Sequence, residues 1–300
     1  MPQIVVGSCG GTLALAQAQS VLAELNETWP DISVVQRTIA GPAQPRGQEQ
    51  GLERSAELLT ALTANRINIA VQRLDTLPLT LPDGLVLGAV SRRLEARTAL
   101  IAADYASLQA LPERAHVAVT SRHEQLFVQS LRPDLEIEVA VGTTKDLLAR
   151  VLHGELTAAL TGAADLIAGG WRERIRALLE PRLMPPPAGR GALGFVVREG
   201  DDLAAELAYT LQHRLSYDRA SAERAFASAL AGALAGAGAE TALGAFATVS
   251  GDGELNLLGA AAGFGGGLSV QAEVAGEASK AEALGRKLAQ DILEQLAARR

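Results

Sequence analysis

The sequence has few of the residues that mark several common functional classes. It contains one cysteine, so no internal disulfide can form, and a single thiol fits a reducing compartment such as the cytoplasm. None of its four histidines is spaced with cysteine or carboxylates as metal ligands are. Its formal net charge of -7 argues against a general nucleic-acid-binding protein, because such proteins present a basic face. We therefore expect no metal and no nucleic-acid partner.

Long, strongly apolar segments are also missing. A membrane-spanning helix needs about 20 such residues, whereas the least polar stretch, 225–247, is mostly alanine and glycine and includes Glu240. The first residues form a strand-like run, and no basic segment followed by an apolar one precedes it. We therefore expect no signal peptide, no membrane partner and a cytoplasmic location.

What the chain does have is an alternation of strand-length apolar runs with segments of helical period. The expected strands cover 3–6, 32–39, 67–74, 85–90, 99–103, 116–120, 135–141 and 156–161. The expected helices between them cover 12–28, 53–64, 122–131 and 144–152. This βαβ pattern is typical of mainly parallel sheets covered by helices.

Two interruptions divide the chain. The first is the pair Arg92-Arg93, and the second is Pro185-Pro186-Pro187, which precedes Gly189-Arg190-Gly191. After the second we expect helices at 203–215 and 220–234, a meander at 245–249, 254–258 and 268–274, and a closing helix at 281–299. The pattern predicts an α/β domain from 1–93 with 190–214, another from 97–186, and a small α+β domain from 217–300.

Five segments, in the right order and spacing, resemble the porphobilinogen deaminase (hydroxymethylbilane synthase) family. They lie at 7–17, 77–85, 131–135, 183–194 and 222–226. The segment at 183–194, for example, is similar to the family's Leu-Pro-Ala-Pro-Gly-Gln-Gly-Ala-Leu-Gly. The resemblance implies a three-domain fold whose first two α/β domains are similar to type II periplasmic binding proteins around a cleft. It also implies a transferase of tetrapyrrole (porphyrin) biosynthesis that polymerises four pyrroles.

The residue that anchors the family's cofactor is missing. The family attaches a dipyrromethane to the cysteine of a Gly-Cys-Gln motif, and the matching stretch is Gly238-Ala239-Glu240. Counting forward from 223–226 without a gap puts Leu234 at that position instead. Neither alignment supplies a thiol, so we expect no cofactor.

The family's catalytic aspartate is also replaced. It closes a His-Ser-Leu-Lys-Asp segment, which here reads Gln72-Arg73-Leu74-Asp75-Thr76. Thr76 stands at the aspartate position, and its hydroxyl stays neutral near pH 7. Asp75 would replace the missing acid only after a one-residue slip of the strand, which would turn each side chain to the opposite face.

The arginines that grip the ligand's carboxylates in the family have changed as well. The first-loop arginine is Cys9, the Ser-Ser-Leu-Arg-Arg run becomes 120–124, and the Arg-Gly-Asn-Val-Asp-Thr-Arg run becomes 141–147. Each loss removes charge-assisted hydrogen bonds worth about 1.5–3 kcal/mol, and Glu124 adds repulsion. The residues that we expect to line an altered ligand site are Cys9, Gly11, Thr12, Arg73, Ser121, Arg122, His123, Thr143, Lys145 and Arg190.

Alternatives stay open for several of these residues. Arg73, Arg122 and Arg190 are either a new anion site for one compact anion or solvated surface arginines. Cys9 is either a small residue filling an arginine's place, which we favour, or a relocated anchor or redox thiol before a helix N-terminus.

Three functional hypotheses follow. The first is a non-catalytic homologue, a pseudoenzyme, that binds a small anionic or pyrrole-related ligand in the cleft between its first two domains. The backbone N–H groups of the turns at 7–12 and 142–145 would support anion binding. The second is an active porphobilinogen deaminase with an altered site, in which Asp75 acts. The third is a structural subunit of an active paralogue.

Overall fold

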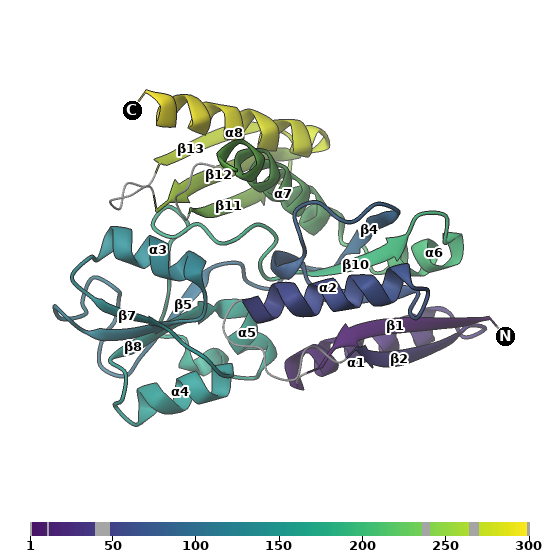
Figure 1. Cartoon of the computed structure of the whole chain (residues 1–300), viewed down its shortest axis with the longest axis horizontal. Coiled ribbons are helices and arrows are strands. Elements are labelled where there is room, and N and C mark those ends of the chain that lie inside the picture. The colour runs from purple at the N-terminus through teal and green to yellow at the C-terminus, as the bar shows by residue number, and fades with distance from the viewer. Residues whose placement is uncertain (1, 11, 40–48, 236–240, 264–269, 299–300) are drawn as a thin grey trace. The chain divides into compact units, whose positions relative to one another are not determined.

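The computed structural model describes residues 2–10, 12–39, 49–235, 241–263 and 270–298 (Figure 1). Their contacts divide the chain into two compact units. The first contains Met1–Arg93 and Ala192–Tyr217, and the second contains Leu94–Gly191 and Asp218–Arg300. The second unit includes two sheets, so the predicted boundary between a second domain at 97–186 and a third at 217–300 stays a prediction.

A five-stranded sheet forms the first unit, in the order β2-β1-β3-β10-β4. The strands are β1 (Gln3–Cys9), β2 (Ser33–Ile39), β3 (Ile69–Arg73), β4 (Leu85–Val90) and β10 (Leu193–Arg198). The helices are α1 (Thr12–Thr28), α2 (Glu49–Thr63) and α6 (Asp202–Thr210). β1 pairs in parallel with β2 and β3, whereas β10 runs antiparallel between β3 and β4. Alternate strand residues such as Ile4, Val6, Ile69 and Val71 pack into a core with α1 and α6.

The second unit contains a sheet of the same size, in the order β7-β6-β8-β5-β9. Its strands are β5 (Thr98–Ala102), β6 (His116–Val119), β7 (Glu136–Val139), β8 (Ala158–Gly162) and β9 (Ala177–Leu178). Its helices are α3 (Arg122–Leu131), α4 (Thr144–Leu152) and α5 (Ala163–Ala168). β6 pairs in parallel with β7 and β8, and β5 runs antiparallel to β8 and β9. α3 and α4 therefore each begin just after a strand at the same end of the sheet.

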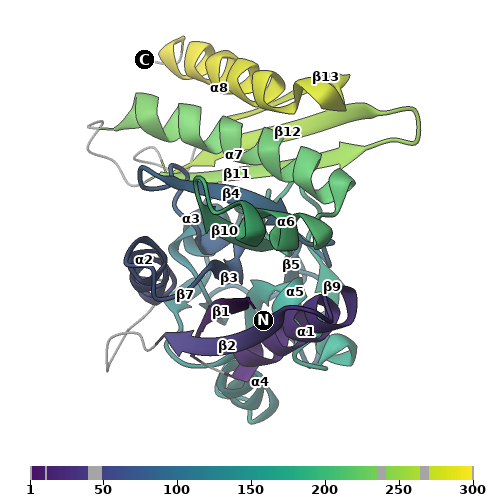
Figure 2. The ribbon, with the colours of Figure 1, turned by 90° about the vertical axis from the view of Figure 1, so that its right-hand side faces the viewer.

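An antiparallel meander of β11 (Ala242–Val249), β12 (Glu254–Ala262) and β13 (Val270–Glu277) completes the second unit. α7 (Arg214–Leu234) and α8 (Ala281–Ala297) lie along this sheet (Figures 1 and 2). The two faces of β12 belong to different cores, because successive side chains point to opposite faces. Leu255, Leu257 and Ala261 pack with α7 and α8. Ala260 and Ala262 pack with α3 instead, which joins the two sheets of this unit.

The chain thus has the predicted architecture of two α/β sheets and a small α+β part, and most predicted elements are confirmed to within a few residues. The helix expected at 203–215 and the strand expected at 67–74 are both shorter, and the strands β9 and β10 and the helix α5 were not predicted. The helix expected at 203–215 ends at Thr210, because Gln212 accepts a hydrogen bond from Val90 N and His213 N donates to Val90 O. The strand expected at 67–74 ends at Arg73. β10 was missed because its partners, β3 and β4, lie more than a hundred residues earlier in the chain.

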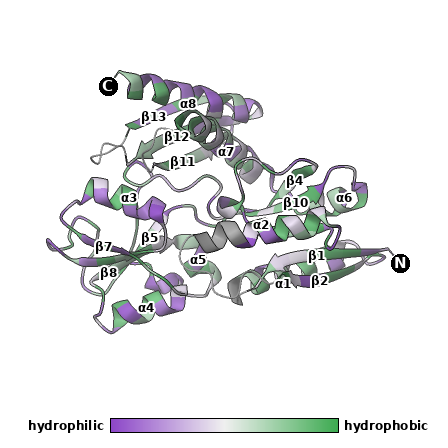
Figure 3. Cartoon of the chain, in the orientation of Figure 1, coloured by the Kyte–Doolittle hydropathy of each residue, from purple (hydrophilic) through white to green (hydrophobic). Residues whose placement is uncertain are grey.

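The helices are amphipathic rather than uniformly apolar. In α8 the buried residues Ala281, Gly285, Leu288, Ala289 and Ile292 recur at helical spacing (Figure 3). The exposed positions include the polar residues Glu282, Arg286, Lys287, Gln290 and Glu294. Among the residues that the structure describes, no helix has both the length and the apolar character needed to cross a bilayer.

Candidate functional site

The segment that aligns with the catalytic aspartate leaves the sheet where that residue would stand. β3 ends at Arg73, and Leu74–Thr76 forms a single 3-10 turn. Leu74 is fully buried and its N–H donates to Ala192 O at 2.9 Å. The argument that Asp75 needs a one-residue slip of the strand therefore does not apply, because a turn, and not a period of two, sets the directions of Asp75 and Thr76.

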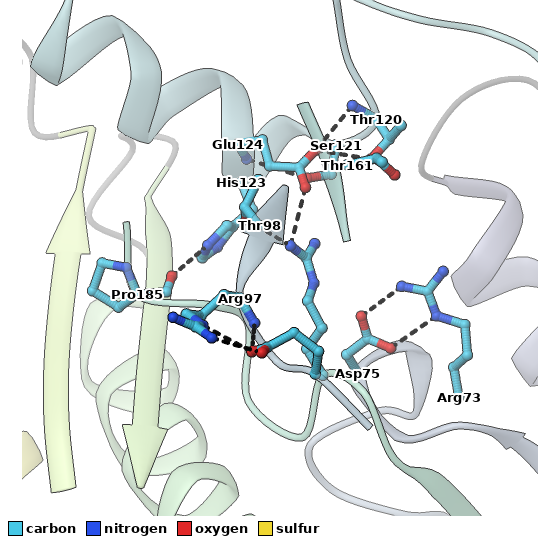
Figure 4. Close-up of polar contacts among 12 residues, drawn as sticks. Arg73, Asp75, Arg97, Thr98, Thr120, Ser121, His123, Glu124, Thr161 and Pro185 are labelled. Carbon is cyan, nitrogen blue, oxygen red and sulfur yellow. Dashed lines mark hydrogen bonds and ion pairs between the residues drawn. The ribbon is translucent and has the colours of Figure 1, made fainter. Parts of the chain in front are cut away.

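Within this turn Asp75 pairs with Arg73. Arg73 Nε donates to Asp75 Oδ1 at 3.0 Å, and Nη2 donates to Oδ2 at 2.7 Å (Figure 4). The Asp75 side chain is 3% exposed and the Arg73 side chain 37%. The Thr76 hydroxyl donates to Arg73 O at 2.8 Å. The only carboxylate of the turn is thus matched by a guanidinium two residues away.

Cys9 is the last residue of β1, and its thiol donates to Arg54 O at 3.6 Å. Burial raises the pKa of the Cys9 thiol above its usual value; the Arg54 guanidinium opposes this rise and Glu57 adds to it. A raised pKa keeps the thiol protonated at neutral pH, whereas nucleophilic and redox-active cysteines have lowered values. Of its predicted neighbours, Thr12 is the first residue of α1, and Gly11 lies outside the described residues.

The N-terminus of α3 places three of the predicted site residues next to one another. Ser121 is the N-cap, and its hydroxyl accepts from Glu124 N at 3.1 Å. His123 is buried and its Nε2 lies 2.9 Å from Pro185 O. Arg122 is exposed and donates to Gln125 at 2.6 Å. These contacts hold His123 to the connector that precedes Arg190.

Glu124 and Arg190 form a fully buried ion pair in the second unit. Arg190 Nη1 donates to Glu124 Oε1 at 3.0 Å and to Thr98 Oγ1 at 3.1 Å. The second carboxylate oxygen of Glu124 accepts from the amide of Thr120 at 2.9 Å and from its hydroxyl at 2.8 Å (Figure 4). The exposed fractions are 4% for the Arg190 side chain and 0% for that of Glu124. Arg190 therefore does not point into bulk solvent.

The two glycines that flank Arg190 form the turn that places its side chain in this buried position. Gly189 and Gly191 have φ angles of 81° and 87°, in the region that favours glycine. A Cβ on Gly191 would also lie 2.7 Å from Glu95 O. The buried carboxylate of Glu223 accepts from Gly189 N and from Ala247 N, each at 2.8 Å. Glu223 thereby ties this turn to β11.

The N-terminus of α4 is capped by hydrogen bonds from its own side chains. The Thr143 hydroxyl accepts from Asp146 N at 3.2 Å, and Asp146 Oδ2 accepts from Thr143 N at 2.8 Å and from its hydroxyl at 2.7 Å. These bonds, first that from the Thr143 backbone, hold the pKa of Asp146 below its usual value. The next residue after Thr144, Lys145, is exposed. An incoming anion would meet the Asp146 carboxylate at this helix end.

Comparison with known proteins settles the ancestry of the chain. The family model described as "Porphobilinogen deaminase, dipyromethane cofactor binding domain" matches residues 4–206. The chain belongs to the porphobilinogen deaminase family. A protein named porphobilinogen deaminase from Thermus thermophilus is 39% identical over 300 residues, covering 98% of this chain and 97% of the relative. Another of that name, from Deinococcus radiodurans, is 34% identical and covers 99% of this chain and 97% of the relative.

The residues present do not fit a porphobilinogen deaminase cofactor bound through a thioether at position 239. Ala239 carries no sulfur, and it lies outside the described residues. The chain's one thiol, that of Cys9, belongs to the first unit, is bonded to Arg54 O and has a raised pKa. We derive no catalytic step through that group.

The structure brings Ser121 and Arg190 together through Glu124, whereas His123 bonds to Pro185 O, and the roles of these residues in ligand binding stay predictions. Sequence reasoning missed Thr98, Thr120 and Thr161, whose hydroxyls lie on β5, after β6 and on β8. It also treated Glu124 and Arg190 separately. Both residues differ from those that the porphobilinogen deaminase family has at these positions. One of the two is acidic and the other is basic. Two substitutions of opposite charge in one chain could have indicated that their side chains form an ion pair.

Proposed function

We propose that this member of the porphobilinogen deaminase family binds a small ligand and does not catalyse deamination. The observation that carries the proposal is the pairing of Asp75 with Arg73 inside the turn that aligns with the catalytic aspartate. In the family the reaction needs a carboxylate that holds a pyrrole N–H and stabilises positive charge as ammonia leaves. A carboxylate whose charge is already matched by a guanidinium at 2.7 Å stabilises a further positive charge poorly.

Thr76 does not restore that function. Its hydroxyl carries no charge near pH 7, and it already donates its proton to Arg73 O. We further propose that the chain carries no covalent dipyrromethane, since position 239 is alanine and the Cys9 thiol is held protonated. Without a primer and without an acid, no route to a linear tetrapyrrole is left.

Incubation of the purified chain with porphobilinogen tests the proposal. The expected result is no hydroxymethylbilane above the uncatalysed background, measured beside an active family member as positive control. Sustained formation of a linear tetrapyrrole, proportional to the concentration of this chain, would overturn it.

A second candidate, an active porphobilinogen deaminase of tetrapyrrole biosynthesis, is favoured by one observation. Relatives that carry that name match over almost the whole chain at identities of 32% to 39%. In this case Asp75 would be the acid, because it is the carboxylate next to the aspartate position. Asp75→Asn would then abolish product formation, whereas Glu282→Gln, an exposed carboxylate paired with Arg286, would leave it unchanged.

The ligand class remains part of the proposal. A pyrrole-related ligand agrees with the ancestry of the chain. A compact anion held by Arg73, Arg122 and Arg190 has less support, because Arg73 and Arg190 already pair with Asp75 and Glu124. Equilibrium binding of porphobilinogen, phosphate and succinate would rank these ligands, and we expect porphobilinogen to bind most tightly. An active paralogue as partner and a cytoplasmic location stay predictions.

A further inference from the structure

The groups that donate hydrogen bonds to the Glu124 carboxylate are of the kinds that hold a bound carboxylate ligand. One oxygen accepts from the guanidinium of Arg190, and the other accepts from a backbone amide and a hydroxyl of Thr120. A guanidinium together with N–H and O–H donors at 2.8–3.0 Å is the donor set that proteins use to hold carboxylates. The N-terminus of α3, where Glu124 is the third residue, adds a favourable dipole.

These donors come from parts of the unit that are fixed independently of Glu124. Arg190 is positioned by the turn between two glycines and by the bond from Gly189 N to Glu223. The hydroxyl of Thr98, which accepts from Arg190 Nη1 and so helps to hold the guanidinium, lies in β5, which pairs with β8 and β9. Thr120 directly follows β6. We therefore expect the donors to keep their positions when the Glu124 side chain is shortened.

We propose that Glu124 fills a carboxylate-binding site of the second unit, and that this site takes a small free monocarboxylate once the Glu124 side chain is removed. In the native chain Glu124 thus determines specificity, because it excludes a ligand's carboxylate from Arg190 and Thr120. This inference concerns the second unit alone and does not rest on the loss of deamination.

The size of the removed group selects the probe. Glu124→Ala deletes a CH2–COO⁻ group, and acetate supplies CH3–COO⁻, with the same number of heavy atoms. Propionate has one more carbon and pivalate three more, so both should fit less well in a site shaped for the glutamate side chain. At pH 7 acetate is ionised and matches the charge of Arg190.

Thermal unfolding in sodium acetate against sodium chloride of equal ionic strength gives the readout. At about ten times the dissociation constant, we expect acetate to raise the midpoint of Glu124→Ala by about 2–3 °C relative to chloride. Propionate should raise it less, and pivalate not at all. The wild-type chain should show no difference between the salts.

Two control variants separate this site from a general salt effect. Glu124→Ala/Arg190→Gln keeps the space but removes the cation, so we expect no acetate shift. Glu282→Ala removes an exposed carboxylate paired with Arg286 at 3.3 Å, and it should show none either. Because Glu124 is fully buried, each sample is unfolded in urea and refolded in its own salt before the measurement.

The outcomes decide the proposal in either case. Equal midpoints for Glu124→Ala in acetate and chloride, or an equal acetate shift in the Arg190→Gln double variant, would overturn it. If Glu124→Ala does not refold in chloride, its refolding yield becomes the readout. Recovery of folded protein in acetate alone would support the proposal, and failure in both salts would refute it.

Discussion

The guanidinium of Arg73 holds the carboxylate of Asp75 through two hydrogen bonds, of 3.0 and 2.7 Å, within one turn at the end of β3. Only the guanidinium has substantial contact with solvent, since the side chains are 37% and 3% exposed. The two charges therefore offset each other in the turn that we align with the family's catalytic acid. This relationship leads to the first prediction.

Arg73→Gln should destabilise the chain more than Asp75→Asn. Removing Arg73 leaves a carboxylate in a buried position, whereas Arg73 can turn to solvent when the Asp75 charge is removed. We expect a cost of about 1–2 kcal/mol for Asp75→Asn and a larger one for Arg73→Gln. Urea unfolding of both variants measures the difference. Equal losses of unfolding free energy, or a larger loss for Asp75→Asn, would contradict the prediction that the buried carboxylate depends on Arg73 more than Arg73 depends on the carboxylate.

The Glu124–Arg190 pair should show strong coupling. Glu124→Gln and Arg190→Gln should each cost about 3–5 kcal/mol, because each removes one charge of a fully buried ion pair. The double variant should cost clearly less than the sum of the two, since no isolated charge remains. The measurement is a double-mutant cycle of urea unfolding free energies, and additive costs would contradict this prediction.

The capping box of α4 should make stability depend on acid pH. The pKa of Asp146 is lowered in the folded chain, so its bonds stabilise the fold above the unfolded value of about 3.9 and are lost as pH falls through the lower folded value. Asp146→Asn should be less stable than wild type near pH 7, and the difference should shrink towards pH 3. Urea midpoints from pH 7 to pH 3 measure this. A difference that stays constant with pH would rule out the carboxylate as its source.

Cys9 should be a slow nucleophile in the folded chain. Burial raises the pKa of its thiol, so the reactive thiolate is scarce at pH 7.5. Alkylation by iodoacetamide should be at least about tenfold slower in the folded chain than in the same chain unfolded in urea. Comparable rates in the two states would instead indicate an exposed thiol with an ordinary pKa.

The sequence predicted the architecture well because periodicity and local signals determine most of it. The bounds of α1, α3, α4 and β4 agree residue for residue with those predicted, and Ser121 and Thr143 lie where helix caps belong. β10 and the break between α6 and α7 were not predictable in this way, because distant strands cause both.

The candidate site was less predictable, for a related reason. Sequence comparison identifies which family residues have changed, but it treats Glu124 as repulsive and Arg190 as a ligand-binding cation. Only the fold shows that the two side chains meet, since they lie 66 positions apart. Similarly, the strand pattern did not reveal the 3-10 turn at Leu74–Thr76, which pairs Asp75 with Arg73.

The intact mass of the purified chain, measured before and after incubation with porphobilinogen, tests the central claim most directly. A chain without a cofactor and without deamination should keep the mass of the bare polypeptide in both samples. A mass increased by two pyrrole units before incubation would show a bound cofactor and contradict the account. A mass that increases by further pyrrole units during incubation would identify the chain as a working deaminase.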